Sequence, residues 1–227
     1  MNLIQTMNLG EYSAQVFYPK TEDISKIDAV VYLFANLEDE NVLLKTDFGN
    51  SIIVKLQGYD WNRDLSPWYA ERVFAKSKDF AGGADAFLQV LENEIIPNIE
   101  KALNLKVSTR AIAGYSMGGL FAVYACLQTN LFQRVASMSG SLWYDGFAEY
   151  AKEHSVYDGL THAYFSVGKK EKFTKNMRMA NVESDTIVVQ KLMNDAGVQT
   201  EFVLQDGGHF DQIPQRIING ICTMLEM

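Results

Sequence analysis

Short apolar segments of strand length alternate along the chain with longer segments whose apolar residues recur every three or four positions. Residues 29–35 form a continuous apolar run, which is typical of a strand covered on both faces. The expected strands span 16–18, 29–35, 51–56, 109–113, 134–139, 161–167 and 200–204, and the expected helices span about 84–103, 117–128, 182–196 and 213–225. Strands that alternate with helices predict an α/β fold, in which a mostly parallel sheet carries helices on both faces.

Two segments depart from this alternation. Residues 57–79 are rich in aromatic and polar side chains without a clean period. We therefore expect a long loop with short helical turns, of the kind that often serves a function. Pro97 falls inside the helix expected at 84–103, where it predicts a kink or a break. The sequence has no visible repeat, low-complexity tract or linker, so we expect residues 1–227 to form a single domain.

The segment around Ser116 carries the clearest chemical signal. Ser116 stands in a Gly-x-Ser-x-Gly motif that follows an apolar run and precedes a helical one. A strand–turn–helix of this kind holds the serine in a strained backbone conformation with its hydroxyl exposed above the sheet. Gly114 and Gly118 fit this geometry because side chains there would collide where strand and helix meet. The Met117 N–H, at the start of the new helix, is then placed to bind an oxyanion.

A phosphate-binding loop is the rival interpretation of the motif. The pattern Gly-x-Gly-x-x-Gly is not matched, because Ser116 occupies the position of the second glycine. No Gly-Lys-Ser/Thr follows either. The flanking strand and helix are instead the context that a nucleophilic serine requires.

A nucleophilic serine needs a general base, and the sequence holds three histidines. His154 lies in a charged segment and His162 opens a strand, so we interpret them as a surface residue and a structural residue. His209 follows the last expected strand and two glycines. That location is the carboxyl edge of the sheet, where Ser116 also lies and where open parallel sheets bind their ligands. The order of serine before histidine agrees with this fold, so His209 is the expected base.

Several residues are candidates for the acid that orients this histidine. Glu171 follows the expected strand at 161–167, where the fold places the acid, and we prefer it although neighbouring lysines also fit a solvated charge. Asp206, three residues before His209, is the rival, but its Asp-Gly-Gly context also fits a turn. Asp185 near a helix start fits a cap, and a bare Ser–His dyad is a further alternative.

Composition narrows the partners and the compartment. A net charge of -8 argues against nucleic acid and an anionic membrane, since each requires a basic face. Cys126 and Cys222 have no metal or redox spacing, and no His/Asp/Glu cluster has ligand spacing, so we expect neither a metal nor a cofactor. The N-terminal residues lack the basic and apolar regions of a signal peptide, and no membrane span is visible, so we expect a cytoplasmic protein.

The second oxyanion donor should come from the loop after residue 35. The candidates are the backbone N–H groups of Asn36 and Leu37. Many hydrolases have a glycine at this place, whereas this chain reads Phe-Ala-Asn-Leu over residues 34–37. The choice between the two donors therefore stays open.

With these residues identified, the chain resembles the "Putative esterase" family of α/β-hydrolases. That family includes esterase D, feruloyl and acetyl-xylan esterases, mycolyltransferases and siderophore trilactone esterases. The resemblance extends from about Asp28 to the C-terminus, and it is carried by Arg-Asp-Leu-Ser-Pro-Trp at 63–68 and by residues 82–88, 94–97, 114–118, 137–143, 168–171 and 207–210. It implies an α/β-hydrolase fold in a minimal form without a separate lid domain.

The resemblance also implies which side chains surround the substrate. The expected pocket residues are Arg63, Tyr115, Trp143 and Trp68, together with the neighbouring Trp61. Arg63 would hold a polar aromatic acyl group, as suits the trilactone-esterase branch, or it would instead pair with a neighbouring aspartate. The tryptophans would otherwise be core residues.

Together these residues predict the hydrolysis of a small-molecule carboxylic ester. Ser116 would attack the carbonyl carbon, His209 would take the hydroxyl proton, and water would then cleave the acyl-enzyme. Acyl transfer to a second alcohol is the nearest alternative. A non-catalytic binding protein that retained the fold is the alternative from another class. We expect a monomer or a homodimer.

Overall fold

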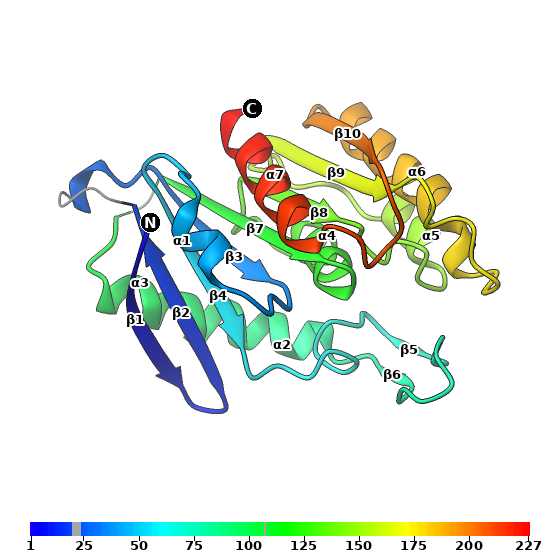
Figure 1. Cartoon of the computed structure of the whole chain (residues 1–227), viewed down its shortest axis with the longest axis horizontal. Helices are drawn as coiled ribbons and strands as arrows, with labels where there is room; N and C mark the ends of the chain where they lie inside the picture. The colour runs from blue at the N-terminus through cyan, green and yellow to red at the C-terminus, as the bar shows by residue number, and fades with distance from the viewer. Residues whose placement is uncertain (20–23, 107) are drawn as a thin grey trace.

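An eight-stranded sheet forms the centre of the computed structural model, which describes residues 1–19, 24–106 and 108–227 (Figure 1). The strands of this sheet are β1 (Asn2–Leu9), β2 (Tyr12–Tyr18), β3 (Ala29–Phe34), β4 (Ser51–Gln57), β7 (Thr109–Tyr115), β8 (Arg134–Met138), β9 (His162–Gly168) and β10 (Gln199–Gln205). Their order is β1-β2-β4-β3-β7-β8-β9-β10. The β1–β2 and β2–β4 pairs are antiparallel and the remaining pairs are parallel. A separate ribbon pairs β5 (Tyr69–Ala70) with β6 (Phe80–Ala81).

Helices cover both faces of the sheet (Figure 1). They are α1 (Asn41–Lys45), α2 (Ala84–Val90), α3 (Ile96–Ala102), α4 (Met117–Gln128), α5 (Phe147–Glu153), α6 (Val182–Asp195) and α7 (Ile213–Glu226), with the short 3₁₀ turns η1 (Ile24–Lys26) and η3 (Met179–Asn181). Helices α1 and α7 pack on one face, and α2 to α6 pack on the other. Among the described residues, no helix is both long enough and apolar enough to traverse a membrane.

The two faces of the central strands explain this layering. In β3, Val30, Tyr32 and Phe34 belong to the larger core, which is shared with α2 to α6. Val31 and Leu33 point the other way and belong to the smaller core beneath α1 and α7. Because successive side chains of a strand alternate between faces, a strand buried on both sides must be apolar throughout.

The expected fold class is confirmed: the chain has the α/β-hydrolase fold, with a mostly parallel sheet between two helical layers. The helix expected at 84–103 is not broken at Pro97. Helices α2 and α3 are joined by the π-helical turn η2 (Leu91–Ile95), after which the Ile96 N–H bonds to the Leu91 carbonyl. The wider turn carries the chain past the proline, which has no N–H to donate.

Several described elements lay outside the sequence-based expectation. They are β1, α1 and α5, together with the short elements η1, η3, β5 and β6. Strand β1 is an edge strand paired on one side to β2, and several of its residues are polar. Helices α1 and α5 have five and seven residues, which is too short for an apolar period to be recognised.

Candidate active site

Ser116 occupies a sharp turn between β7 and α4. Its backbone has φ 57° and ψ −122°, a combination that costs energy for a residue with a side chain. Neighbouring backbone groups hold the turn in place. The Ser116 N–H donates to the Met138 carbonyl at 3.1 Å, and the Ser141 N–H donates to the Ser116 carbonyl at 2.9 Å. The strained conformation is therefore held by the end of β8 and the loop that follows it.

Two glycines make this turn sterically possible. A Cβ atom on Gly114 would lie 2.1 Å from the Gly118 carbonyl carbon, and a Cβ atom on Gly118 would lie 2.1 Å from the Phe34 carbonyl oxygen. Strand β7, helix α4 and the end of β3 thus approach one another with no room for a side chain. Both glycines of the motif have a steric role, as the sequence predicted.

His209 lies in the loop after β10, within reach of the serine. Its Nε2 atom is 3.0 Å from the Ser116 Oγ atom. The Tyr115 hydroxyl donates to the backbone carbonyl of His209 at 2.5 Å, which ties the histidine loop to the last residue of β7. A hydroxyl and an imidazole at this distance can transfer a proton.

Glu171 lies in the loop after β9 and contacts the other ring nitrogen of His209. Its Oε2 atom is 2.8 Å from Nδ1. Its Oε1 atom accepts three hydrogen bonds, from the Ser139 hydroxyl at 2.7 Å, the Gly168 N–H at 2.7 Å and Arg216 Nη1 at 3.0 Å. Burial by itself would raise the pKa of the Glu171 carboxyl, but the hydrogen bonds from His209, Ser139 and Gly168 hold this pKa below its usual value. The carboxylate is thus kept charged beside the imidazole.

The rival acid, Asp206, lies elsewhere. Its side chain is 85% exposed, and its carboxylate pairs with the Lys169 ammonium at 2.7 Å. The other two histidines are also apart from Ser116. His154 stacks on the Tyr150 ring, and His162 begins β9. The structure therefore brings Ser116, His209 and Glu171 together, and it does not bring Asp206 into contact with the imidazole.

The expected oxyanion donors lie beside the serine. Met117 is the first residue of α4, and the first N–H groups of a helix have no carbonyl partner within that helix. Phe34 at the end of β3 is in register with Gly114 of β7, which brings the loop that follows β3 alongside the turn. Asn36, Leu37, Met117 and Ser116 all line one cavity.

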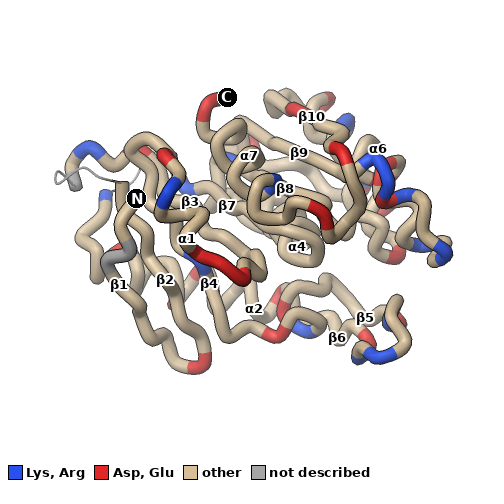
Figure 2. Tube along the Cα trace, in the orientation of Figure 1, with Lys and Arg blue, Asp and Glu red and all other residues tan. Residues whose placement is uncertain are grey.

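This cavity has a volume of about 970 Å³ and opens at the carboxyl edge of the sheet. Its walls are mainly apolar and aromatic, and they include Tyr59, Trp61, Val73, Phe74, Phe80, Tyr115, Trp143, Met179, Phe210, Ile213 and Pro214. Glu38 and Asp39 line it on the loop that precedes α1, where Figure 2 shows an acidic segment. Lys55 lines it too, but its ammonium pairs with Glu40 at 2.6 Å. The cavity can thus accommodate a bulky apolar or aromatic group next to the serine.

The expected pocket residues divide into two groups. Tyr115 and Trp143 line the cavity, as does Trp61. Arg63 does not line it; its guanidinium makes a two-point pair with the Asp64 carboxylate at 2.6 and 3.0 Å. Trp68 does not line it either; its ring packs against three aromatic side chains, those of Tyr144, Phe147 and Tyr150. Arg63 and Trp68, which the resemblance places around the substrate, thus lie outside the lining of this cavity.

Sequence reasoning missed the residues that surround the Glu171 carboxylate. Ser139 has a positive φ of 45° and directs its hydroxyl at Glu171. Arg216 lies on α7 and is 2% exposed. Its position in an amphipathic helix is typical of a surface residue, so the sequence carried no signal for its burial.

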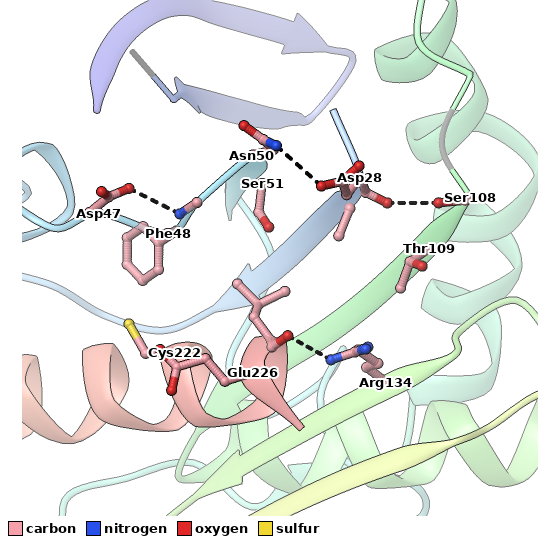
Figure 3. A pocket seen from close by; sticks show the side chains of 13 residues that line it. Asp28, Asp47, Phe48, Asn50, Ser51, Ser108, Thr109, Arg134, Cys222 and Glu226 are labelled. Carbon is pink, nitrogen blue, oxygen red and sulfur yellow. Dashed lines mark hydrogen bonds between the residues drawn. The ribbon is translucent and has the colours of Figure 1, made fainter. Parts of the chain in front are cut away.

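A second cavity, of about 330 Å³, lies at the opposite edge of the sheet (Figure 3). Its polar side chains mostly bond to one another or to backbone groups around it. Asn50 Nδ2 donates to the Asp28 carboxylate at 3.3 Å, and Arg134 Nη1 donates to two carbonyls near the end of α7 at 2.6 and 2.9 Å. The residues described contain no group of three or more His, Cys, Asp or Glu side chains suited to a metal ion. We interpret this cavity as structural.

Comparison with known proteins agrees with the fold. The chain is 28% identical over 137 residues to the uncharacterised protein YbbA of Bacillus subtilis, a match covering 59% of this chain and 55% of that protein. It is 27% identical over 143 residues to the ferri-bacillibactin esterase BesA of the same organism, covering 59% of this chain and 48% of that protein. The chain thus aligns with about half the length of each relative.

A solved structure has the same fold. The IroE-like serine hydrolase from Shewanella oneidensis superposes with a TM-score of 0.75 at 18% identity, over 98% of this chain and 80% of the other. The sequence model of one esterase family matches residues 27–212, which is most of the chain. The chain therefore belongs to the family described as "Putative esterase".

Proposed function

We propose that this protein is a serine carboxylic-ester hydrolase in which Ser116 is the nucleophile, His209 the general base and Glu171 the acid that orients the base. The observation that carries the proposal is the continuous hydrogen-bonded chain from Ser116 Oγ to His209 Nε2 and from Nδ1 to Glu171 Oε2, at 3.0 and 2.8 Å. This arrangement of nucleophile, base and orienting acid is the one that activates a serine hydroxyl at neutral pH.

The first half of the reaction forms an acyl-enzyme. Ser116 Oγ attacks the ester carbonyl carbon while its proton passes to His209 Nε2. The carbonyl oxygen becomes an oxyanion, which the Met117 N–H and an N–H of Asn36 or Leu37 stabilise. When the carbon–oxygen bond to the alcohol breaks, the leaving oxygen takes the proton from Nε2. The charged Glu171 carboxylate stabilises the imidazolium that exists between these two transfers.

The second half repeats these steps with water. Nε2 takes a proton from a water molecule as the water oxygen attacks the acyl carbon. The bond to Ser116 Oγ then breaks, Oγ recovers the proton, and the carboxylic acid leaves. These steps need only the side chains and backbone amides named above.

The cavity supports a small-molecule ester with an aromatic or bulky apolar group, because aromatic side chains such as Trp61 and Trp143 line it beside Ser116. A siderophore-type ester is the second candidate substrate, favoured by the likeness to the ferri-bacillibactin esterase BesA. The residue first expected to hold such an acyl group, Arg63, lies outside this cavity, so that support for the siderophore candidate is weakened.

Intact-mass analysis after treatment with a fluorophosphonate tests the proposal. We expect one adduct on the wild type and on Ser155→Ala, a control at an exposed serine, and none on Ser116→Ala. Wild type should hydrolyse 4-nitrophenyl benzoate, and Ser116→Ala should lose at least about 10³-fold in kcat. An adduct on Ser116→Ala would contradict the assignment.

Two further measurements separate the alternatives. Product analysis with added acceptor alcohols distinguishes hydrolysis from acyl transfer, because a transferase yields a new ester in place of the free acid. Comparison of a catecholate trilactone with simple aromatic esters distinguishes the two substrate candidates. A wild-type protein that forms no adduct and cleaves no ester would favour a binding protein that retained the fold.

A further inference from the structure

A buried arginine contacts the acid of the triad without entering the reaction steps above. Arg216 lies in the first turns of α7 and is 2% exposed. Its Nη1 atom donates to Glu171 Oε1 at 3.0 Å and to the Ser139 hydroxyl at 2.9 Å, and its Nη2 atom donates to the Asp206 carbonyl at 2.9 Å. Burying a charge is costly unless it is paired and hydrogen-bonded, so its contacts require an explanation.

These contacts join three loops that follow neighbouring strands. Ser139 follows β8, Glu171 follows β9, and Asp206 follows β10 at the start of the loop that carries His209. A Cβ atom on Gly168 would lie 2.7 Å from Nη2, so the guanidinium fills the space beside that glycine. One planar group thus fixes the loop that carries Glu171 (the acid loop) relative to the loop that carries His209 (the histidine loop).

The hydrogen bonds also orient the carboxylate. Oε1 accepts from Ser139, Gly168 and Arg216, whereas Oε2 accepts from His209 Nδ1. Three donors on one oxygen resist rotation of the carboxylate and leave the other oxygen aimed at the imidazole. Arg216 also donates to the Ser139 hydroxyl, which is itself one of the three donors to Oε1. The arginine therefore helps to hold this second donor in place.

We propose, given the triad of the proposed function, that Arg216 is a positioning residue: it keeps Glu171 charged and aimed at His209 and holds the histidine loop in register. The guanidinium acts through the carboxylate and touches neither Ser116 nor the substrate. Without it, a buried carboxylate would retain a proton more readily, and the imidazole would lose the partner that selects its tautomer.

Other charged groups near the carboxylate do not replace this cation. On the acid loop, Lys169 pairs with the Asp206 carboxylate and Lys172 pairs with Glu183, at 2.7 and 3.0 Å. Lys170 on the same loop is exposed. On the histidine loop, the Asp211 carboxylate accepts from the Gly208 N–H at 2.7 Å.

From β7, the Tyr115 phenol faces the same network, and its pKa is raised, mainly by burial, so it stays neutral near pH 7. Among the residues that the structure describes, His209 and Arg216 are the positively chargeable groups bonded directly to Glu171.

The test compares Arg216→Gln and Arg216→Lys with Arg134→Gln. Arg134 is a matched control because it also anchors α7, through the Met224 and Leu225 carbonyls, but at the far edge of the sheet. For Arg216→Gln we expect kcat on 4-nitrophenyl benzoate to fall by about 10- to 100-fold and the acidic limb of the profile of kcat/KM against pH to move upward. Arg216→Lys should restore part of the lost kcat and part of the shift of the acidic limb. Arg134→Gln should change neither kcat nor the acidic limb.

A second readout does not depend on activity. Carbon-13 NMR of the Glu171 carboxyl, measured in a Ser116→Ala background, should show a higher pKa in Arg216→Gln than in the parent. Ser139→Ala, which keeps the arginine and removes one donor to Oε1, should give a shift in the same direction if Arg216→Gln does not fold.

Distinct results overturn the two proposals. An inactive wild type contradicts the proposed function, and the NMR titration then still decides whether Arg216 holds the carboxylate charged. A folded Arg216→Gln with wild-type kcat, an unmoved acidic limb and an unmoved carboxyl titration overturns the positioning role. Loss of stability alone, equal to that of Arg134→Gln, would mean that Arg216 is only an anchor for α7.

Discussion

The substitution Gly118→Ala separates local helix preference from tertiary constraint. Gly118 lies in the first turn of α4, where alanine would by itself stabilise the helix by about 0.5–1 kcal/mol. The structure predicts the opposite, because the added Cβ would lie 2.1 Å from the Phe34 carbonyl oxygen, whereas ordinary contact begins at 3.4 Å. The atom in the way belongs to the backbone of β3, so helix and strand must separate by about 1 Å.

That separation acts on stability and on catalysis together. Overpacking of this kind costs about 1–3 kcal/mol of the free energy of unfolding. It also moves Met117 at the start of α4 away from Asn36 and Leu37 after β3, and these residues carry the proposed oxyanion donors. A shift of about 1 Å in such groups lowers kcat by roughly 10²-fold.

Urea unfolding and steady-state kinetics with an activated ester measure both effects. Gly220→Ala is the matched control, because Gly220 is also helical and crowded, on α7, and its added Cβ would meet the flexible Met138 side chain at 2.6 Å. We expect this control to lose stability and keep kcat within about threefold. A Gly118→Ala protein that is more stable than wild type, or that retains wild-type kcat, would refute the reasoning.

The remaining predictions concern the acid and the cavity. Glu171→Gln should lower kcat by about 10³-fold or more, whereas Asp206→Asn should change it less than about threefold, as steady-state kinetics on both variants would reveal. Because the pKa of Glu171 is lowered in the folded state, its charge stabilises the fold above its unfolded pKa, and this contribution is lost as the pH falls through the folded value. The difference in urea stability between wild type and Glu171→Gln should therefore shrink below about pH 4.5, and a constant difference would contradict this. Trp61→Ala should raise KM for aromatic esters several-fold, and Arg63→Gln, an exposed ion-pair partner, should leave KM unchanged; the reverse pattern would restore Arg63 to the pocket.

The sequence by itself determined the fold class and pointed to Ser116 and His209 as the proposed nucleophile and base. Continuous apolar runs of strand length such as 29–35 are typical of strands buried on both faces, and strands that alternate with helices favour a mostly parallel sheet. The carboxyl ends of such strands share one edge, so residues directly after them, Ser116 and His209, were expected to meet. These inferences depend on chain order and residue type, which are local properties.

Only the tertiary structure decided which side chains meet at that edge. Glu171 and Asp206 both follow parallel strands, and the choice depends on loop conformation: one carboxylate turns inward to His209 and the other outward to Lys169. Arg216 illustrates the same limit, since its polar side chain is buried only because three loops supply acceptors for it. Such contacts join residues far apart in the chain, and a sequence pattern carries no information about the distance between their atoms.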